Sequence, residues 1–255
     1  MDMYAAGRSY SQVNQARSAL ALHLSTTSIP KPQWITQSPL VKATLKAYYR
    51  NTGPARKRFP IRGYILHHIA HQFFLLYPTT TAQLLTLALY TSYYCLLRVS
   101  ELCALIWQHL AWVATHLSLY LGVTKGDQQA KHPYLTVTEP SLLHMLSHIQ
   151  TTTHPNPLHP VIPYTPAQLN YALQQALQNL TTEYPIPTGA FCTWHSLRHG
   201  RAVDLHLQGT STQSLCQQGR WGSQAAANLY LYFTNPRHWP THSHHITQAK
   251  PPSTH

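Results

Sequence analysis

Residues 194–232 of the chain read WHSLRHGRAVDLHLQGTSTQSLCQQGRWGSQAAANLYLY. His195 and Arg198 are three positions apart, so a helix here places both side chains on one face, one turn apart. Further along, Trp221 follows Arg220, and Tyr230 follows Trp221 by nine positions. Arginine binds phosphate in a planar fork, histidine moves protons near neutral pH, and tyrosine can act as a covalent nucleophile. This combination favours chemistry on a phosphodiester.

A second motif, LRVSEL at residues 97–102, follows an apolar stretch. An arginine in so apolar a segment is expected to be paired or to bind an anion. A buried ion pair between Arg98 and Glu101 is one explanation, and phosphate binding by Arg98 is the other. Both hold at once if Glu101 orients a neighbouring basic group.

Basic residues dominate the charge of the chain: 18 Lys and Arg face 6 Asp and Glu, giving a net charge of +12 over 255 residues. A solvated surface normally mixes both signs, so this excess favours a polyanionic partner such as nucleic acid. A compositional bias of the genome is the alternative, since Thr, Gln, His and Pro are also abundant. The hydrophobic fraction of 44% predicts a globular fold.

The cysteines form no CxxC pair, which is typical of reduced, mostly buried thiols in an intracellular protein. The first residues lack an apolar run flanked by basic residues, so we expect no secretory signal. Residues 84–97 are the most apolar stretch but are too short to cross a membrane, so they predict a core helix and no membrane partner. His67 and His71 have helical spacing without the glutamate of a metalloprotease motif, and we expect no metal site and no cofactor.

Periodicity predicts a mainly helical (α+β) chain with a small antiparallel sheet. Helices are expected at residues 9–24, 38–50, 64–77, 82–96 (capped by residues 79–81), 140–150 and 166–181. Alternation predicts strands at 117–123 and 133–138, joined by a turn that carries Lys125. We expect a helical segment over residues 1–60, one larger domain over 61–235 and a disordered tail over 236–255, with residues 51–63 as a flexible basic connector.

Several basic side chains in the first part of the chain are suited to a DNA backbone. Lys42, Lys46 and Arg50 recur every fourth residue on one predicted helix, and this stripe either follows phosphates or is a solvated face. The connector adds more positive charge, and a further arginine precedes Trp221. The expected DNA-contacting residues are Lys42, Lys46, Arg50, Arg56, Lys57, Arg58, Arg62 and Arg220.

The order and spacing of these motifs resemble the active site of the tyrosine recombinase (phage-integrase-like) family, over residues 64–235. The strings LRVSEL and HSLRHGRA match most closely. The resemblance implies a catalytic set of Arg98, Lys125, His195, Arg198, Trp221 and Tyr230. The family carries its catalytic lysine on a β-hairpin, where Lys131 is the rival of Lys125. Most bacterial and phage members have His at the fifth position, and a subset uses Trp there.

The motif GRW, the N-terminal helices and the basic connector resemble the recombinases of DIRS-type retrotransposons and related eukaryotic mobile elements. The segment before the catalytic domain is shorter than is usual in the family, so either the DNA clamp is reduced or the chain is a degenerate or mis-delimited copy. The resemblance implies double-stranded DNA as partner, a homotetramer on paired sites, and a nuclear location if the host is eukaryotic, otherwise a cytoplasmic one.

The implied reaction cuts and rejoins DNA strands through a 3′-phosphotyrosyl intermediate, with Tyr230 as nucleophile and Arg98 and Arg198 binding the phosphate oxygens. The implied proton donor to the leaving 5′-oxygen is Lys125. Tyr232 is the alternative nucleophile, but it points about 200° away from Tyr230 in a helix. The alternative functions are a catalytically inactive or domesticated DNA-binding relative and a DNA-relaxing enzyme like type IB topoisomerases.

Overall fold

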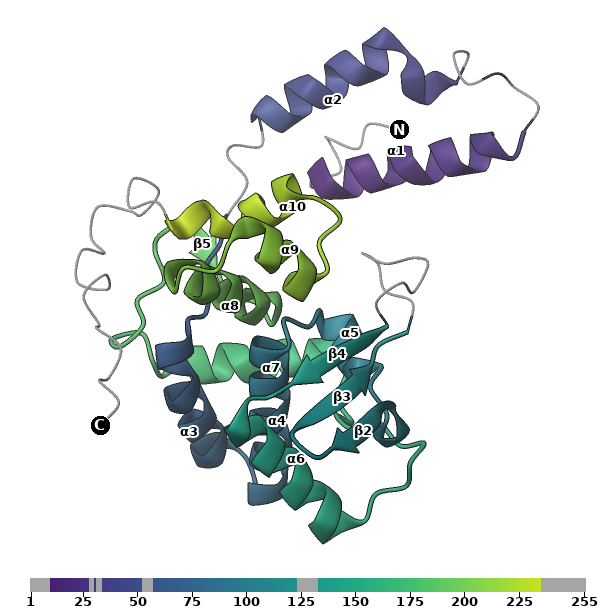
Figure 1. Ribbon diagram of the computed structural model, residues 1–255. Helices are drawn as coiled ribbons and strands as arrows, with labels where there is room; N and C mark the ends of the chain where they lie inside the picture. Colours follow the sequence, from purple (N-terminus) through teal and green to yellow (C-terminus); the bar gives the residue numbers. More distant parts are fainter. Residues whose placement is uncertain (1–9, 28–29, 31–33, 52–56, 123–132, 235–255) are drawn as a thin grey trace. The chain divides into compact units, whose positions relative to one another are not determined.

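The computed structural model describes residues 10–27, 30, 34–51, 57–122 and 133–234. These residues are mostly helical and include a small antiparallel sheet (Figure 1), which confirms the predicted fold class. The contacts divide the chain into two units, Met1–Arg56 and Lys57–His255. Within the described residues, no helix combines the length and apolar character needed to span a bilayer.

The first unit contains α1 (Tyr10–Ser25), a 3-10 turn η2 (Ile35–Gln37) and α2 (Pro39–Asn51). Proline suits the first turn of α2 because no N–H is needed there. The facing apolar side chains of α1 and α2 include Val13, Leu20 and Leu45. The two predicted helices are therefore confirmed to within a residue at each end.

The second unit begins with the short strand β1 and continues through helices and a hairpin sheet. Its helices are α3 (Leu66–Leu76), α4 (Thr79–Tyr94), α5 (Val99–Cys103), α6 (Pro140–Thr153), α7 (Pro166–Gln178), α8 (His195–Leu207), α9 (Thr212–Gly219) and α10 (Gln224–Asn228). Its 3-10 turns are η3 (Gly63–Ile65), η4 (Trp107–His109) and η5 (Leu229–Thr234). Its strands are β1 (Lys57–Arg58), β2 (Leu110–Val113), β3 (His116–Tyr120), β4 (Tyr134–Val137) and β5 (Ala190–Phe191).

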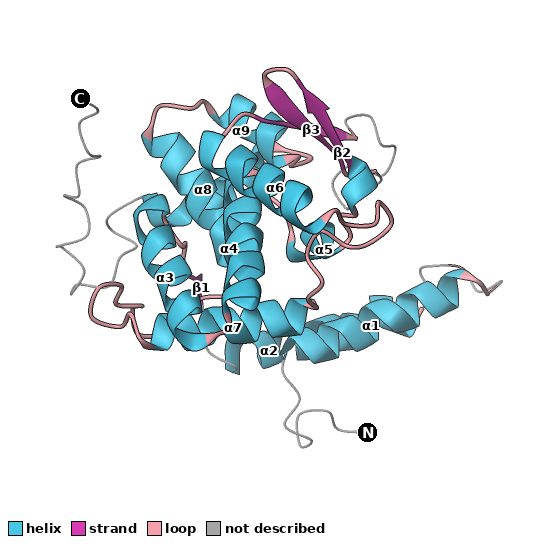
Figure 2. Ribbon diagram, turned by 90° about the horizontal axis from the view of Figure 1, so that it is seen from below, coloured by secondary structure: helices cyan, strands magenta, loops and turns pink. Residues whose placement is uncertain are grey.

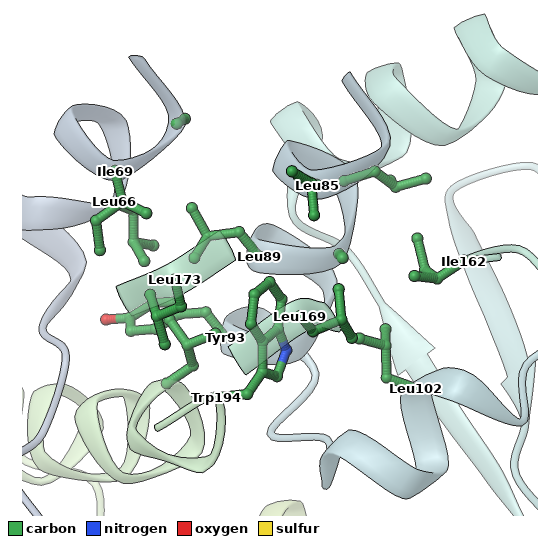
Figure 3. Close-up of a cluster of buried hydrophobic side chains, with 14 of the residues drawn as sticks. Leu66, Ile69, Leu85, Leu89, Tyr93, Leu102, Ile162, Leu169, Leu173 and Trp194 are labelled. Carbon is green, nitrogen blue, oxygen red and sulfur yellow. The ribbon is translucent and has the colours of Figure 1, made fainter. Parts of the chain in front are cut away.

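Helix α4 is the centre of the core, and it contacts α3, α5, α6 and α8 (Figure 2). Leu87 and Leu89 of α4 are fully buried, as the uninterrupted apolar run of this segment predicts. Trp194 fills the space beside the helix, and its indole N–H donates to Ser92 Oγ at 2.7 Å (Figure 3). The predicted start at residue 82 is wrong by one turn: residues 79–81 form the first turn of α4 and Pro78 precedes it.

The antiparallel sheet has the order β2-β3-β4. Leu119 of β3 pairs with Leu110 on one side and Leu135 on the other, and Leu119 is buried. The strands predicted at 117–123 and 133–138 are therefore present, but the sequence did not predict β2. That strand is short and its residues after Leu110 are exposed, so it lacks the alternation that identifies a half-buried strand.

Residues 57–63 are fixed to the second unit, so the prediction of a flexible connector is wrong for this part. Strand β1 pairs in parallel with β5, and Phe59 N–H donates to the carbonyl of Phe191 at 2.8 Å. Ile61 N–H then donates to the carbonyl of Ser196 at 2.9 Å. Burial of Phe59 and Ile61 explains why this segment is fixed in place, because these apolar side chains leave water when they pack.

Two residues of α8 hold this segment in place. A Cβ atom on Gly200 would lie 1.6 Å from the Ile61 carbonyl oxygen, so only glycine permits this approach. One turn further on, the Asp204 carboxylate pairs with Arg62 and accepts the Gly63 N–H at 2.7 Å and the Tyr93 hydroxyl. The middle and the last turn of α8 are thereby fixed against residues 61–63 and α4.

Candidate active site

Helix α8 carries the first two site residues on one face, as the three-residue spacing predicts. Arg198 has no exposed side-chain surface. Its guanidinium donates to the carbonyl oxygens of Leu96 and Gly219. Arg198 therefore joins the turn before α5 to the end of α9, two segments far apart in the sequence.

The turn between α4 and α5 positions Arg98. Leu96 adopts a positive φ of 50°, which reverses the chain direction after α4 and places Arg98 at the start of α5. Glu101 accepts the Arg98 backbone N–H at 2.9 Å, and it also pairs with the Arg98 guanidinium. The ion pair that was one of the two explanations for LRVSEL is therefore present, and phosphate binding by Arg98 remains a prediction.

The turn between α9 and α10 positions Trp221. Arg220 ends α9 in the left-handed conformation, with φ 53° and ψ 43°. The indole of Trp221 folds back onto Gly219, where a Cβ atom would lie 2.0 Å from the ring. The Arg198 guanidinium carbon lies 4.7 Å from the centroid of the Trp221 ring, a cation–π contact.

Glu101 is the common partner of three arginines. Besides Arg98, its Oε2 atom lies 3.1 Å from Nη2 of Arg220 and 3.9 Å from Nη1 of Arg198. Burial by itself raises the pKa of this carboxyl, but Arg220, Arg98 and Arg198 together hold the pKa below its usual value. Three guanidinium groups thus surround one carboxylate, so positive charge is in excess in a largely buried site.

Tyr230 of η5 completes the cluster. Its hydroxyl lies 2.8 Å from Nε2 of His195. The Tyr230 ring packs on Trp221 at 4.7 Å between centroids and on His199 at 5.5 Å, and the Arg198 guanidinium carbon lies 5.8 Å from its centroid. The side chain of Tyr232 lies outside the described residues, so the choice between the two tyrosines stays a prediction.

His195 and His199 are uncharged at neutral pH. Burial, with the positive charges of Arg58 and Arg198 next, lowers the pKa of His195 to about 3. Burial also lowers the pKa of His199 to about 4. Because a neutral imidazole has one unprotonated nitrogen, His195 can accept a proton as well as donate one. Burial and the charge of Arg98 lower the pKa of Arg198 to about 10, which leaves it charged at neutral pH.

Three buried N–H donors of the arginine and tryptophan side chains near Glu101 have no hydrogen-bond partner in the described part of the chain: Nε of Arg198, Nε of Arg220 and Nε1 of Trp221. A buried donor without a partner is costly. An anion between Arg98, Arg198 and Trp221 would satisfy such donors and balance the excess positive charge. The donor set suits a phosphate group, which accepts from several N–H groups at once.

The structure thus brings five of the six predicted catalytic residues together: Arg98, His195, Arg198, Trp221 and Tyr230. Lys125 and its rival Lys131 lie outside the described residues. The strands β3 and β4 that flank them form the predicted hairpin. Among described residues, no group of three His, Cys, Asp or Glu side chains could hold a metal ion.

The predicted DNA-contacting residues have different surroundings. Lys42 and Lys46 are exposed on α2, whereas Arg62 pairs with Asp204 and Arg220 with Glu101 inside the second unit. Arg58 is half-buried on β1, with its guanidinium carbon 5.7 Å from the centroid of the Phe191 ring. Arg56 and the side chains of Arg50 and Lys57 lie outside the described residues.

Sequence reasoning did not anticipate Arg58 and His199 as neighbours of the site. Arg58 reaches His195 because β1 pairs with β5, which leads into α8. A two-strand parallel pairing leaves no pattern in the sequence. His199 follows His195 by four positions, so the helical spacing alone could have identified it.

No protein-family model and no curated protein matches this chain. Among solved structures, it resembles XerH site-specific recombinase bound to difH substrate in a pre-cleavage complex, with a TM-score of 0.61, 13% identity, and coverage of 89% of this chain and 64% of that chain. It also resembles Tn1549 transposon integrase in complex with transposon right end DNA, with a TM-score of 0.60, 12% identity, and coverage of 89% of this chain and 77% of that chain.

A lambda integrase dimer bound to a COC′ core site gives a TM-score of 0.58 at 16% identity, over 91% of this chain and 61% of that chain. This chain spans 52% of the XerH chain in its post-cleavage complex, so it corresponds to only part of some of these proteins. At such identities the likeness concerns the fold, which is that of tyrosine recombinase catalytic domains.

Proposed function

We propose that the chain is a tyrosine recombinase that cuts and rejoins DNA strands through a 3′-phosphotyrosyl intermediate. The observation that carries the proposal is the Tyr230 hydroxyl, 2.8 Å from Nε2 of His195, beside a cluster of buried arginines. A phenol next to a proton acceptor and an anion site is the arrangement that nucleophilic attack on a phosphodiester requires.

In this proposal the scissile phosphate lies between Arg98, Arg198 and Trp221. The two guanidinium groups bind its non-bridging oxygens, and the indole N–H of Trp221 donates to one of them. Attack by a phenolate adds negative charge to the phosphoryl group. The excess positive charge around Glu101 stabilises that charge more strongly in the transition state than in the ground state.

The proton of Tyr230 is transferred to neutral His195 as the Tyr230 oxygen attacks phosphorus. The bond from phosphorus to the 5′-oxygen breaks, and the leaving oxygen takes a proton, which the family resemblance assigns to Lys125. Reversal with a 5′-hydroxyl from another strand releases Tyr230 and rejoins DNA. Since one phosphoester replaces another, the exchange requires no external energy source.

The finer parts of the proposal rest on the sequence motifs. The basic composition and the exposed Lys42 and Lys46 support binding to double-stranded DNA. The GRW motif and the N-terminal helices support an element of the DIRS type, acting in integration of mobile DNA in the nucleus of a eukaryotic host. Recombination between paired sites would require a homotetramer.

The test uses the full chain with nicked duplexes that trap a covalent complex, because the short cleaved strand diffuses away. We expect the wild-type protein to form a denaturation-resistant adduct and Tyr230→Phe to form none while still binding DNA. Binding without any adduct would instead support an inactive DNA-binding relative. Relaxation of a supercoiled plasmid without paired sites would support topoisomerase-like activity.

A further inference from the structure

The backbone conformation of Arg220 is unusual for its residue type. It occupies the position after α9 with φ 53° and ψ 43°, in the left-handed region that glycine adopts at helix ends. A side chain there carries a conformational cost that glycine does not. The described residues include only two other non-glycine residues with positive φ, Leu96 and His154. The contacts of the Arg220 side chain must therefore offset the free-energy cost of its left-handed backbone conformation.

Those contacts all lie inside the second unit. Nη2 of Arg220 donates to Glu101 Oε2 and to the Leu96 carbonyl, each at 3.1 Å. Nη1 donates to the carbonyls of Gln218 at 3.3 Å and Cys95 at 3.5 Å. The residue is only 9% exposed. Its guanidinium is therefore directed at the α4–α5 turn rather than at a ligand in solvent.

Arg220 shares two interaction partners with Arg198. Both guanidinium groups donate to the Leu96 carbonyl oxygen, and Oε2 of Glu101 lies within 3.9 Å of both. The same carboxylate pairs with Arg98 through its other oxygen. One carboxylate and one carbonyl thus fix three guanidinium groups relative to one another.

The charge of Glu101 explains why a third arginine matters. A buried carboxylate must be paired. Without Arg220, Arg98 and Arg198 are the only cations that remain among the described residues to balance it, and the proposed function assigns these two groups to the phosphate. Burial raises the pKa of Glu101, and the charge of Arg220 is the largest influence that lowers it.

We propose that Arg220 is a positioning residue: it holds Glu101 and the Leu96 carbonyl so that Arg98 and Arg198 stay directed at the scissile phosphate. This role rests on the proposed function. It differs from direct DNA contact, because Arg220 acts through Glu101 and the Leu96 carbonyl and does not itself contact the phosphate.

The experiment is a double-mutant cycle of Arg220→Gly and Glu101→Gln. Glycine suits the left-handed backbone, so the turn is retained when the side chain is lost. Two quantities are measured for the wild type, both single variants and the double variant. One is the single-turnover rate of adduct formation on a nicked duplex, and the other is the dissociation constant of inorganic phosphate, from thermal shifts.

We expect Arg220→Gly to lower the adduct rate about 100-fold, because a small misplacement of catalytic groups has an effect of this size. In the Glu101→Gln background, Arg220→Gly should lower the adduct rate by less than about 10-fold, since the effects of coupled residues are not additive. Phosphate affinity should show the same coupling. Arg220→Lys, which keeps the charge without the planar fork, should restore only part of the rate.

Arg201→Gln is the matched control, because Arg201 lies on α8 over the rings of Tyr93 and Tyr94 and does not contact Glu101 in the described structure. It should lower the melting temperature and leave the rate and the phosphate affinity within about threefold of wild type.

The positioning role would be overturned if Arg220→Gly lowered the adduct rate equally in the wild-type and Glu101→Gln backgrounds. Full restoration of the rate in Arg220→Lys would also overturn it. So would a wild-type rate in Arg220→Gly. If the wild-type protein forms no adduct but the coupling appears in phosphate affinity, the proposed function fails, whereas the positioning of Arg98 and Arg198 at a phosphate-binding site stands. If neither an adduct nor coupling is found, both fail.

Discussion

The Tyr230 hydroxyl lies 2.8 Å from Nε2 of His195, although 35 positions separate the two residues. The contact depends on the turn at Gly219 and Arg220, which returns the chain across α8. A phenol and a neutral imidazole at this distance can exchange a proton directly.

His195→Gln should slow adduct formation about 100-fold, the usual contribution of a general acid or base. Because the folded-state pKa of His195 is about 3, the rate of adduct formation by the wild-type protein should not fall as the pH drops through 6.5. Single-turnover rates between pH 5 and 8 provide the measurement. A limb near pH 6.5 that disappears in His195→Gln would contradict the neutral imidazole.

Tyr230→Phe should abolish the covalent adduct, whereas Tyr232→Phe should retain it, because the Tyr230 hydroxyl lies beside the proton acceptor His195. Mass spectrometry of the nucleotide-linked peptide identifies the attached residue. An adduct that survives in Tyr230→Phe and disappears in Tyr232→Phe would assign the nucleophile to Tyr232.

Lys42→Ala should weaken DNA binding and reduce the slope of log K against log salt by about one, since each phosphate contact releases counterions. Binding titrations over a series of salt concentrations measure the slope. Thr44→Ala, at an exposed position on the same helix, is the control. An unchanged slope in Lys42→Ala would place this lysine on a solvated face.

Gly200→Ala should destabilise the second unit by about 3 kcal/mol or more, because the new Cβ would overlap the Ile61 carbonyl. Gly222→Ala is a suitable control, since no atom lies within 4 Å of a Cβ there. Denaturant unfolding of both variants tests the difference. Similar stabilities would mean that the 57–63 segment is not held against α8.

The free energy of unfolding should decrease as the pH falls below 6.5. His195 and His199 have folded-state pKa values of about 3 and about 4, below the usual 6.5. The unfolded chain therefore binds protons that the folded chain does not, with a slope of up to about 1.4 kcal/mol per pH unit for each histidine. This contribution is complete above pH 6.5.

Denaturant unfolding at pH 7 and pH 5 measures this slope. His199→Gln should reduce it, and the same change at the exposed His148 should not. A slope that is unchanged in both His195→Gln and His199→Gln would show that neither histidine is held neutral by the fold.

The sequence by itself determined the fold class, most helices, the β3–β4 hairpin and five residues that meet in the site. These features follow from local patterns. Helical spacing places His195 and Arg198 on one face, and apolar runs identify α4.

Only the tertiary structure decided which basic residues face inward and which strands pair. Arg62 and Arg220 look like surface cations in the sequence, yet they pair with Asp204 and Glu101, partners 142 and 119 positions away. Strand β1 likewise depends on β5, far along the chain. Such long-range partners leave no periodic pattern, because their free energy arises from burial and charge pairing after the chain has folded.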